Sequence, residues 1–428
     1  MGRFAIKKSA VDEKETVVTD EKQTAVTDQK QTAVTGRNLR KAEKNASTEK
    51  RIWIRRVVMT IIFLILILTA YRLNTMKKTE LVTRTGNTYE KGIVQEVLHD
   101  NLQADGTRSG EQVVTVKMTT GVRKGEVIQM TSSSGFLFGT ACTPGLHVIV
   151  VQSVSGDSTV SSVYSRDRGG MILLFGLLYL VALIAVGGRQ GLKASACLII
   201  TFFIIIFIWI PLIYLRVSPI RSAVVVCALT TILTFWCIGG ISRKTITATL
   251  GTVSGVVIAG IFAELFSLAT GISGWNVSDI ETLLTIWESN RIKVGGLLFA
   301  GILISALGAE MDVAMSISSS MQEVCRQNPG ISRWELFCAG MRVGRDMMGT
   351  DSNTLLLAFV GTEVSQLVLN FAYDLPAAQV LNSNNIGIAV MQGLSGSFGI
   401  VLSVPITVLI ASWIFRGKPS DSVEQILQ

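Results

Sequence analysis

The sequence predicts an all-α polytopic membrane bundle of about eight transmembrane helices, with one small extracytoplasmic all-β domain of OB-like type. Three observations carry this prediction. The 428 residues are 49% apolar and only 16% charged, whereas soluble proteins carry about 25% charged residues. Apolar runs long enough to cross a bilayer recur from residue 57 onward. One stretch, residues 77–168, interrupts them with short alternating segments that are typical of β-strands.

The chain begins with a polar, repetitive tail. Two octads, VTDEKQTA and VTDQKQTA, follow one another at residues 18–33, and nothing in residues 1–52 can bury a core. We therefore expect a disordered basic cytoplasmic tail. Residues 53–76 are predicted to form the first transmembrane anchor, because their apolar run lacks the small-residue site of a cleaved signal peptide. The arginines ahead of that run place the N-terminus in the cytoplasm.

Residues 77–168 are predicted to form a separate β domain outside the cell. Turn signals such as Asp105-Gly106 separate five short alternating runs. These runs are Tyr89–His99, Gln112–Met118, Gly125–Thr131, His147–Val154 and Ser158–Tyr164. Five strands in so short a stretch are typical of a small barrel or sandwich. The single anchor ahead of them puts the domain on the extracytoplasmic side.

Residues 169–416 are predicted to form a seven-helix membrane bundle, followed by a cytoplasmic C-terminal tail at 417–428. The candidate spans are residues 170–187, 194–215, 221–240, 245–271, 294–312, 353–372 and 387–415. With the first anchor they make eight crossings of the cell membrane, so both termini lie in the cytoplasm. Lys and Arg are more frequent in the segments that this topology places inside. Residues 279–292 predict an amphipathic helix at the outer surface.

The stretch from Gly340 to Gly361 concentrates charge at the mouth of an apolar run. On a helix, one face would carry the four polar side chains Arg342, Arg345, Asp346 and Asn353. Arg342 and Asp346 are four residues apart, so their charges can touch. Ionisable groups at a membrane boundary are expensive, and they mark either a function or a structural ion pair.

Two other spans carry polar groups on one face. Glu264 lies inside an apolar run and shares its side with Gly260, Ser267 and Gly271. The next span carries a stripe at helical spacing that contains Ser305, Gly308, Asp312, Ser316, Ser319 and Glu323. The main candidates for an ion or solute pathway are Glu264, Asp312, Arg342, Arg345, Asp346 and Asn353. Further candidates on the same helices are Glu310, Asp351, Ser305 and Ser316.

Two interpretations of these residues stay open. In the structural interpretation, small residues at 251 and 255 and at 340 and 344 allow close helix packing, and Arg342–Asp346 is a satisfied ion pair near the cytoplasm. In the functional interpretation, the acids line a pathway, and the helix is broken near Gly349-Thr350, as in many transporters.

The sequence favours no enzyme, cofactor or metal. Gly393-Leu394-Ser395-Gly396 matches an intramembrane serine protease pattern, but both histidines, His99 and His147, lie outside the apolar spans. The six cysteines show no C-x-x-C spacing, and no H-E-x-x-H or Walker A motif is present. Acidic residues dilute the basic tail and no aromatic residues interleave with it, so nucleic acid is not an expected partner.

Five segments resemble the YibE/F family of bacterial membrane proteins: ALGAEMDV at 306–313, NP at 328–329, ELF at 335–337, GRDMMGT at 344–350 and NTL at 353–355. The resemblance covers about residues 77–415. It implies a multi-pass membrane protein with an extracytoplasmic domain between its first two spans, and it names no activity. Where the family pattern has an apolar residue and Thr before Asn-Thr-Leu, this chain has Asp351-Ser352. An acid facing a cavity there would alter ion preference, whereas one facing water would change nothing.

The leading functional hypothesis is a permease for an ion or small solute. Glu264, Asp312 and Asp346 would bind a cation or proton, the two arginines would bias or gate the site, and Asn353 would supply a hydrogen-bonding wall. The alternative is a non-transporting envelope scaffold or sensor, in which the β domain binds a protein partner and the bundle only anchors it in the bilayer.

Overall fold

The computed structural model describes residues 57–58, 60–75, 87–133, 139–155, 158–277, 280–290 and 292–416. The chain divides into two compact units, residues 1–75 and 76–428. In the first unit, the apolar helix Thr60–Asn74 coincides with the predicted anchor. The predicted tails at 1–52 and 417–428 lie outside the described residues.

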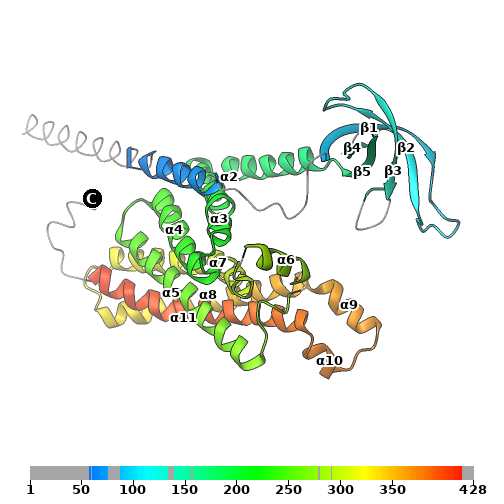
Figure 1. Cartoon of the computed structure of the whole chain (residues 1–428). Helices are drawn as coiled ribbons and strands as arrows, with labels where there is room; N and C mark the ends of the chain where they lie inside the picture. The colour runs from blue at the N-terminus through cyan, green and yellow to red at the C-terminus, as the bar shows by residue number, and fades with distance from the viewer. Residues whose placement is uncertain are drawn as a thin grey trace, which may run out of the picture. The chain divides into compact units, whose positions relative to one another are not determined.

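Five strands form a closed barrel in the order β1-β2-β3-β5-β4 (Figure 1). Their bounds are β1 Asn87–His99, β2 Glu111–Met118, β3 Val127–Ser133, β4 His147–Ser155 and β5 Ser158–Arg166. Neighbouring strands run antiparallel, except that β3 and β5 run parallel. The five predicted strands are thus confirmed, and the domain is a small five-stranded barrel, the architecture that OB folds share.

One buried amide ties two loops of the barrel to its apolar core. The Nε2 of Gln112 donates a hydrogen bond to Asp100 Oδ1 at 2.8 Å, and its Oε1 accepts one from the Cys142 backbone N–H at 2.7 Å. The hydrogen bonds that Gln112 and Arg108 donate to Asp100 hold the pKa of that carboxyl below its usual value. Cys142 itself is buried, and burial raises the pKa of its thiol. Gln112 therefore connects the loop after β1 to the loop before β4.

The membrane region is built from long apolar helices. Their bounds are α2 Gly169–Ile204, continued by η1 Ile205–Trp209 and α3 Ile210–Tyr214, then α4 Pro219–Gly239, α5 Arg243–Thr270, α6 Ile280–Asn290, η2 Val294–Gly296, α7 Leu297–Gln327, α8 Arg333–Thr362, α9 Val364–Ala372, α10 Ala377–Leu381 and α11 Asn384–Arg416. The described part of the chain holds five helices long and apolar enough to cross a membrane. There are six if α8 and α9, which meet at 58°, form one span.

Helix α2 is sharply broken at Gly188, whose φ of 54° and ψ of −128° are not helical. A Cβ added at Gly191 would collide with the carbonyl group of Leu183. Those two residues would lie about 12 Å apart on a straight helix, so the chain turns back at the break. The predicted spans 170–187 and 194–215 are the two sides of this break.

Local sequence signals fix several helix ends. The Ser242 side chain accepts a hydrogen bond from the Thr245 N–H at the start of α5, and Gly271 ends that helix in the left-handed conformation. Ser332 and Glu335 form a capping box at the start of α8. The predicted amphipathic helix at 279–292 is confirmed as a helix, α6, and its place at the outer surface stays a prediction.

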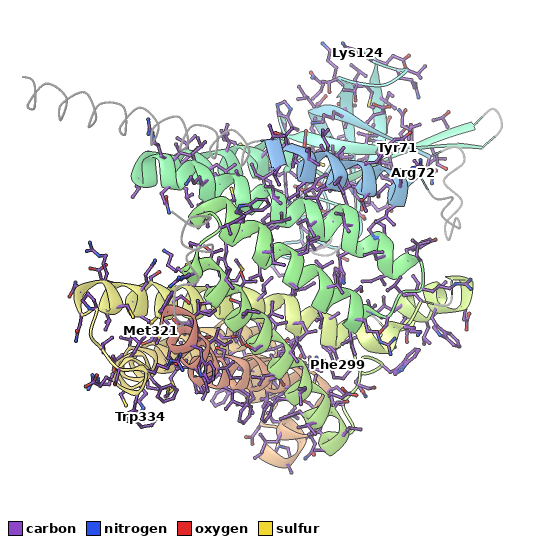
Figure 2. All side chains as sticks on the ribbon, turned by 90° about the vertical axis from the view of Figure 1, so that its left-hand side faces the viewer. Tyr71, Arg72, Lys124, Phe299, Met321 and Trp334 are labelled. Atoms are coloured by element: carbon purple, nitrogen blue, oxygen red, sulfur yellow. The ribbon has the colours of Figure 1, made fainter. Side chains whose placement is uncertain are left out.

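Helix α11 packs against α5, α7 and α8, and glycines set the spacing between these helices (Figure 1). A Cβ at Gly251 would collide with Thr407, and one at Gly344 would collide with Val404. A Cβ at Gly340 would lie 2.6 Å from the Met321 sulfur and 2.8 Å from Val408. The small residues at 251, 340 and 344 therefore pack closely, as the structural interpretation expected. Figure 2 shows Phe299 and Met321 at opposite ends of α7, with Trp334 of α8 near the Met321 end.

We expect Gln112→Leu to loosen the barrel. It would leave the Cys142 N–H without a partner, which costs about 1–3 kcal/mol. Local opening should then expose the Cys142 thiol more often, so labelling of Cys142 in the purified protein should accelerate by on the order of tenfold. Mass spectrometry of the Cys142 peptide measures this rate. Gln152→Leu is the matched control, because the Gln152 Nε2 is buried and has no hydrogen-bond partner among the described residues. Equal labelling rates in the two variants would contradict the expectation.

Candidate functional site

Glu310 is the most deeply buried acid in the described part of the bundle. It lies near the middle of α7, and its side chain is 0% exposed. Both of its carboxylate oxygens are enclosed without a hydrogen-bond partner among the described residues. Its closest neighbours belong to the middle of α5 and of α11. A lone carboxyl at such a position favours the neutral, protonated form, because the charged form has lost its water.

Two glycines make the space that the Glu310 carboxyl fills. A Cβ added at Gly255 of α5 would collide with this carboxyl, and so would one added at Gly399 of α11. At Gly399 the added atom would also lie 2.9 Å from the Gly255 carbonyl oxygen and from the Ala259 Cβ. Three helices therefore meet at a point where any larger residue would displace the acid.

Two hydroxyl groups lie close to Glu310, and both donate to backbone carbonyl oxygens. The Ser403 hydroxyl of α11 lies near the Glu310 carboxyl, yet it donates its hydrogen bond to the Ile400 carbonyl oxygen at 2.9 Å. This leaves the lone pairs of the Ser403 oxygen free to accept a hydrogen bond from a protonated carboxyl. The Thr252 hydroxyl donates instead to the backbone carbonyl of Glu310 at 3.4 Å. The surroundings thus suit the neutral acid better than the carboxylate.

Asp312 and Asp351 form a second acidic feature, the acid pair, between α7 and α8. Asp312 is exposed, and its carboxylate interacts with that of Asp351. The Asp351 Oδ2 is buried without a hydrogen-bond partner in the described residues. Asp351 therefore faces another acid. Ser305 is exposed and Ser316 half-buried, and the helical spacing places both on the Asp312 side of α7.

The charged face predicted on α8 is confirmed as a face, but its side chains point away from the bundle core. Arg342, Arg345, Asp346 and Asn353 are all exposed. Among the described residues, Arg342 and Asp346 form no ion pair, so the expected satisfied pair is wrong. An exposed pair four residues apart gains only about 0.3–0.5 kcal/mol, and Arg ahead of Asp is the less favourable order.

The predicted helix break near Gly349-Thr350 is also wrong. Helix α8 continues through these residues to Thr362, and the chain bends at Glu363, where α9 begins. A single glycine weakens a helix by only about 1 kcal/mol, which packing against α7 and α11 easily offsets. Gly349 therefore contributes an open surface on α8 instead of a break.

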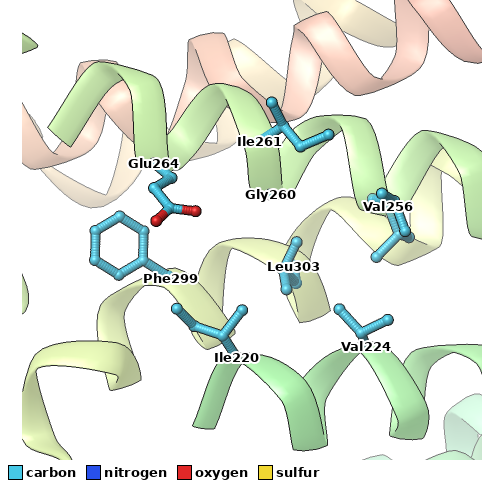
Figure 3. Close-up of a pocket in the computed structure, with 9 residues that line it drawn as sticks. Ile220, Val224, Val256, Gly260, Ile261, Glu264, Phe299 and Leu303 are labelled. Atoms are coloured by element: carbon cyan, nitrogen blue, oxygen red, sulfur yellow. The ribbon is translucent and has the colours of Figure 1, made fainter. Parts of the chain in front are cut away.

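Glu264 lies apart from both acidic features. It is exposed and lines a pocket of about 190 Å³ between α4, α5 and α7 (Figure 3). The other lining residues are apolar or glycine: Ile220, Val224, Val256, Val257, Gly260, Ile261, Phe299 and Leu303. The pocket lining includes neither Asp312 nor Asp346, so the acids predicted to meet between helices do not all meet.

Sequence reasoning ranked Glu310 below Asp312, and the structure shows why. The two residues lie two positions apart on α7, so their side chains point to nearly opposite sides of the helix. The polar stripe that contains Asp312 predicts a polar helix face, because its members repeat at helical spacing. The signal for Glu310 was different, an isolated acid surrounded by apolar and small residues on its own face. No group of three or more His, Cys, Asp or Glu side chains in the described residues could hold a metal ion.

We expect Gly255→Ala to destabilise the bundle through Glu310 alone. The three atoms nearest to an added Cβ at this position all belong to the Glu310 carboxyl group. The substitution should lower the unfolding temperature by on the order of 5 °C in detergent, and this penalty should vanish when Glu310→Ala is also present. Gly301→Ala is the control on α7, because its added Cβ meets nothing within 4 Å. An equal penalty with and without the Glu310 carboxyl would contradict this account.

The membrane region matches one known family. The profile of the YibE/F-like proteins matches residues 175–417, more than half of the 428-residue chain. The match contains Glu310 and the acid pair and leaves the barrel outside, so the resemblance from residue 77 is not confirmed. No curated protein and no solved structure matches the chain. On the profile match, this membrane protein belongs to the YibE/F-like protein family.

Proposed function

We propose that this protein moves an ion or a small solute across the cell membrane, and that Glu310 is the proton-binding group of that process. The observation that carries the proposal is the Glu310 carboxyl itself, which is fully buried at mid-bundle without a hydrogen-bond partner among the described residues. Ionisable side chains inside a membrane protein are costly and mostly mark ion or proton pathways.

If the helix bundle only anchored the barrel, the buried Glu310 carboxyl would have no role. A bundle that only held the barrel at the membrane would be more stable with an apolar side chain in the same space, because a buried group without a partner costs free energy. The glycines at 255 and 399 add to the argument, since both positions must stay without a side chain to accommodate Glu310. Two helices are therefore adapted to keep one carboxyl at the centre.

The neutral acid can release its proton only when water or a cation reaches it. In the described structure, Gly255, Gly399 and Ser403 surround the carboxyl, so release requires α5 or α11 to move. A proton that leaves only in one arrangement of the helices is the basis of coupled transport. On the exposed side of α7 and α8, the acid pair would then act as a cation-binding site, and the Arg342 and Arg345 side chains would act as a gate.

We further propose eight crossings with both termini in the cytoplasm and the barrel outside. The break at Gly188 would divide α2 and its continuation into two spans, and α8 with α9 would form another. Helix Thr60–Asn74, α4, α5, α7 and α11 supply the remaining five. The connection between α7 and α8 then lies in the cytoplasm, and α6 lies at the outer surface.

A thiol-labelling experiment tests this topology. An impermeant maleimide should label Lys124→Cys, at an exposed site in the barrel (Figure 2), in intact cells stripped of any outer barrier. Gly330→Cys, in the α7–α8 connection, should react only after the membrane is permeabilised. The unaltered chain gives the background, and its barrel thiol contributes little because Cys142 is 2% exposed. Labelling of both sites before permeabilisation would exclude the eight-span arrangement.

A reconstitution experiment tests the function. Purified protein in liposomes should carry protons, followed with a trapped pH-sensitive dye, when a potassium diffusion potential drives them. Glu310→Gln should reduce this flux at least tenfold, because the amide fills the same space but cannot release a proton. Glu281→Gln on α6 is the matched neutralisation outside the bundle interior and should leave the flux unchanged.

Two other outcomes of the same assay would indicate a different pathway or a different function. Undiminished flux in Glu310→Gln together with loss in Glu264→Gln would move the pathway to the pocket of Figure 3. Absence of proton and alkali-cation flux in the unaltered protein would favour the scaffold or sensor hypothesis. In that case binding of a protein partner by the barrel becomes the property to measure.

A further inference from the structure

Among the described residues of the bundle, a charged helix face stays open at the side. We define the α7/α8 polar face by Asp312, Arg342, Arg345, Asp346 and Asn353, all of which are exposed. Helices α7 and α8 pack together through Ile317, Met321, Leu336 and Leu355, so the two parts of this face lie on neighbouring helices. Within the described residues, Arg345 and Asp346 form no ion pair.

The charged part of this face lies along α8, beyond an exposed tryptophan. Trp334 is 71% exposed near the start of α8, and the Arg333 guanidinium carbon lies 5.2 Å from the centre of the Trp413 ring. Exposed tryptophans beside arginine are typical of the membrane–water interface. Arg345 follows Trp334 by eleven residues, about 16 Å along the helix, which is roughly half of a bilayer's hydrocarbon core. If Trp334 lies at the interface, Arg345 and Asp346 reach into the hydrocarbon core, where unpaired charges that face lipid are costly.

We propose that a second copy of this chain covers the α7/α8 polar face. The argument is charge complementarity. Arg345 and Asp346 are adjacent in sequence and therefore lie at nearly the same depth. In a two-fold dimer whose axis runs along the membrane normal, residues at equal depth meet each other. Arg345 of each copy then lies opposite Asp346 of the partner subunit, and both charges gain the partner that they lack among the described residues of one chain.

The same face has the shape that such an interface needs. An added Cβ at Gly308 or Gly349 would meet nothing within 4 Å, so both glycines lie on open surface. Gly340 and Gly344, in contrast, already pack inside the chain. Small residues on open faces allow two membrane helices to approach closely. Gly349 lies three residues after Asp346 on α8, which places it beside the proposed ion pairs.

The dimer would also complete the acid pair. Asp312 lies on the polar face and interacts with Asp351, so each copy would present two carboxyl groups toward the two-fold axis. Four such groups near one axis must share protons or bind a cation between them. One chain alone supplies half of this site. The proposal rests on the exposed charges and holds whether or not Glu310 carries protons.

A crosslinking experiment tests the interface directly. Gly349→Cys in native membranes, treated with a mild oxidant, should give a covalent dimer, because the two-fold axis brings this position close to its counterpart. Leu250→Cys, an exposed position on α5, is the control and should stay monomeric. The unaltered chain reports any dimer formed by the six native cysteines.

A charge exchange tests the ion pairs. Arg345→Asp and Asp346→Arg, each alone, should reduce the dimer fraction of protein extracted in lipid particles at least tenfold, because each places like charges opposite one another. The double variant exchanges both signs in both copies and should restore the dimer. This recovery distinguishes lost pairing from failed folding, since a folding defect would persist in the double variant.

Two results would overturn the proposal. The first is a single-chain mass for the unaltered protein in lipid particles together with no crosslink at Gly349→Cys. The second is a double variant that dimerises no better than the single variants while keeping the unfolding temperature of the unaltered protein.

Discussion

Close packing between glycine-bearing helices is the constraint on which the rest of the membrane bundle depends. Inside a bilayer, the hydrophobic effect does not drive one helix against another, so contact between small residues must supply the attraction. Here Gly251 of α5 contacts Thr407, and Gly344 of α8 contacts Val404, both on α11. Helix α11 thus becomes the common neighbour of α5, α7 and α8. A Cβ at either glycine would push α5 or α8 away from α11 and loosen the apolar packing between them.

The same packing that holds the helices also encloses a group that is costly to bury, the Glu310 carboxyl. Gly255 and Gly399 bring α5 and α11 close enough to surround Glu310 of α7 and exclude water from it. Separating these helices would hydrate the acid and favour its charged form, whereas closing them would favour the neutral form. Protonation and helix packing at this point are therefore linked in both directions. Such a linkage is absent at Glu264, which is exposed in its pocket.

Much of the architecture could be predicted from sequence because it follows from periodicity and length. Alternation located the five strands, and apolar runs located the long helices. Periodicity also showed that polar residues on α7 and α8 share faces, but it could not show which face meets the core. The neighbouring helices decide which face is buried. Val404 and Val408 of α11 pack against the glycine face of α8, so the face that carries Arg345 is exposed. Glu310 was underrated for the same reason, since its neighbours come from α5 and α11, more than fifty residues away.

The two acids of α7 link the two faces of this helix mechanically. Glu310 points toward α5 and α11, and Asp312, two residues later, points toward α8 and the open polar face. A rigid helix cannot turn one side chain without turning the other, because both are fixed to the same backbone. A movement of α7 relative to α5, α8 and α11 would therefore change both the enclosure of Glu310 and the distance between Asp312 and Asp351. If a second copy completes the acid pair, the contact between copies and the proton on Glu310 would influence one another through this single helix. Coupling of that kind needs no further element, because α7 already touches both sites.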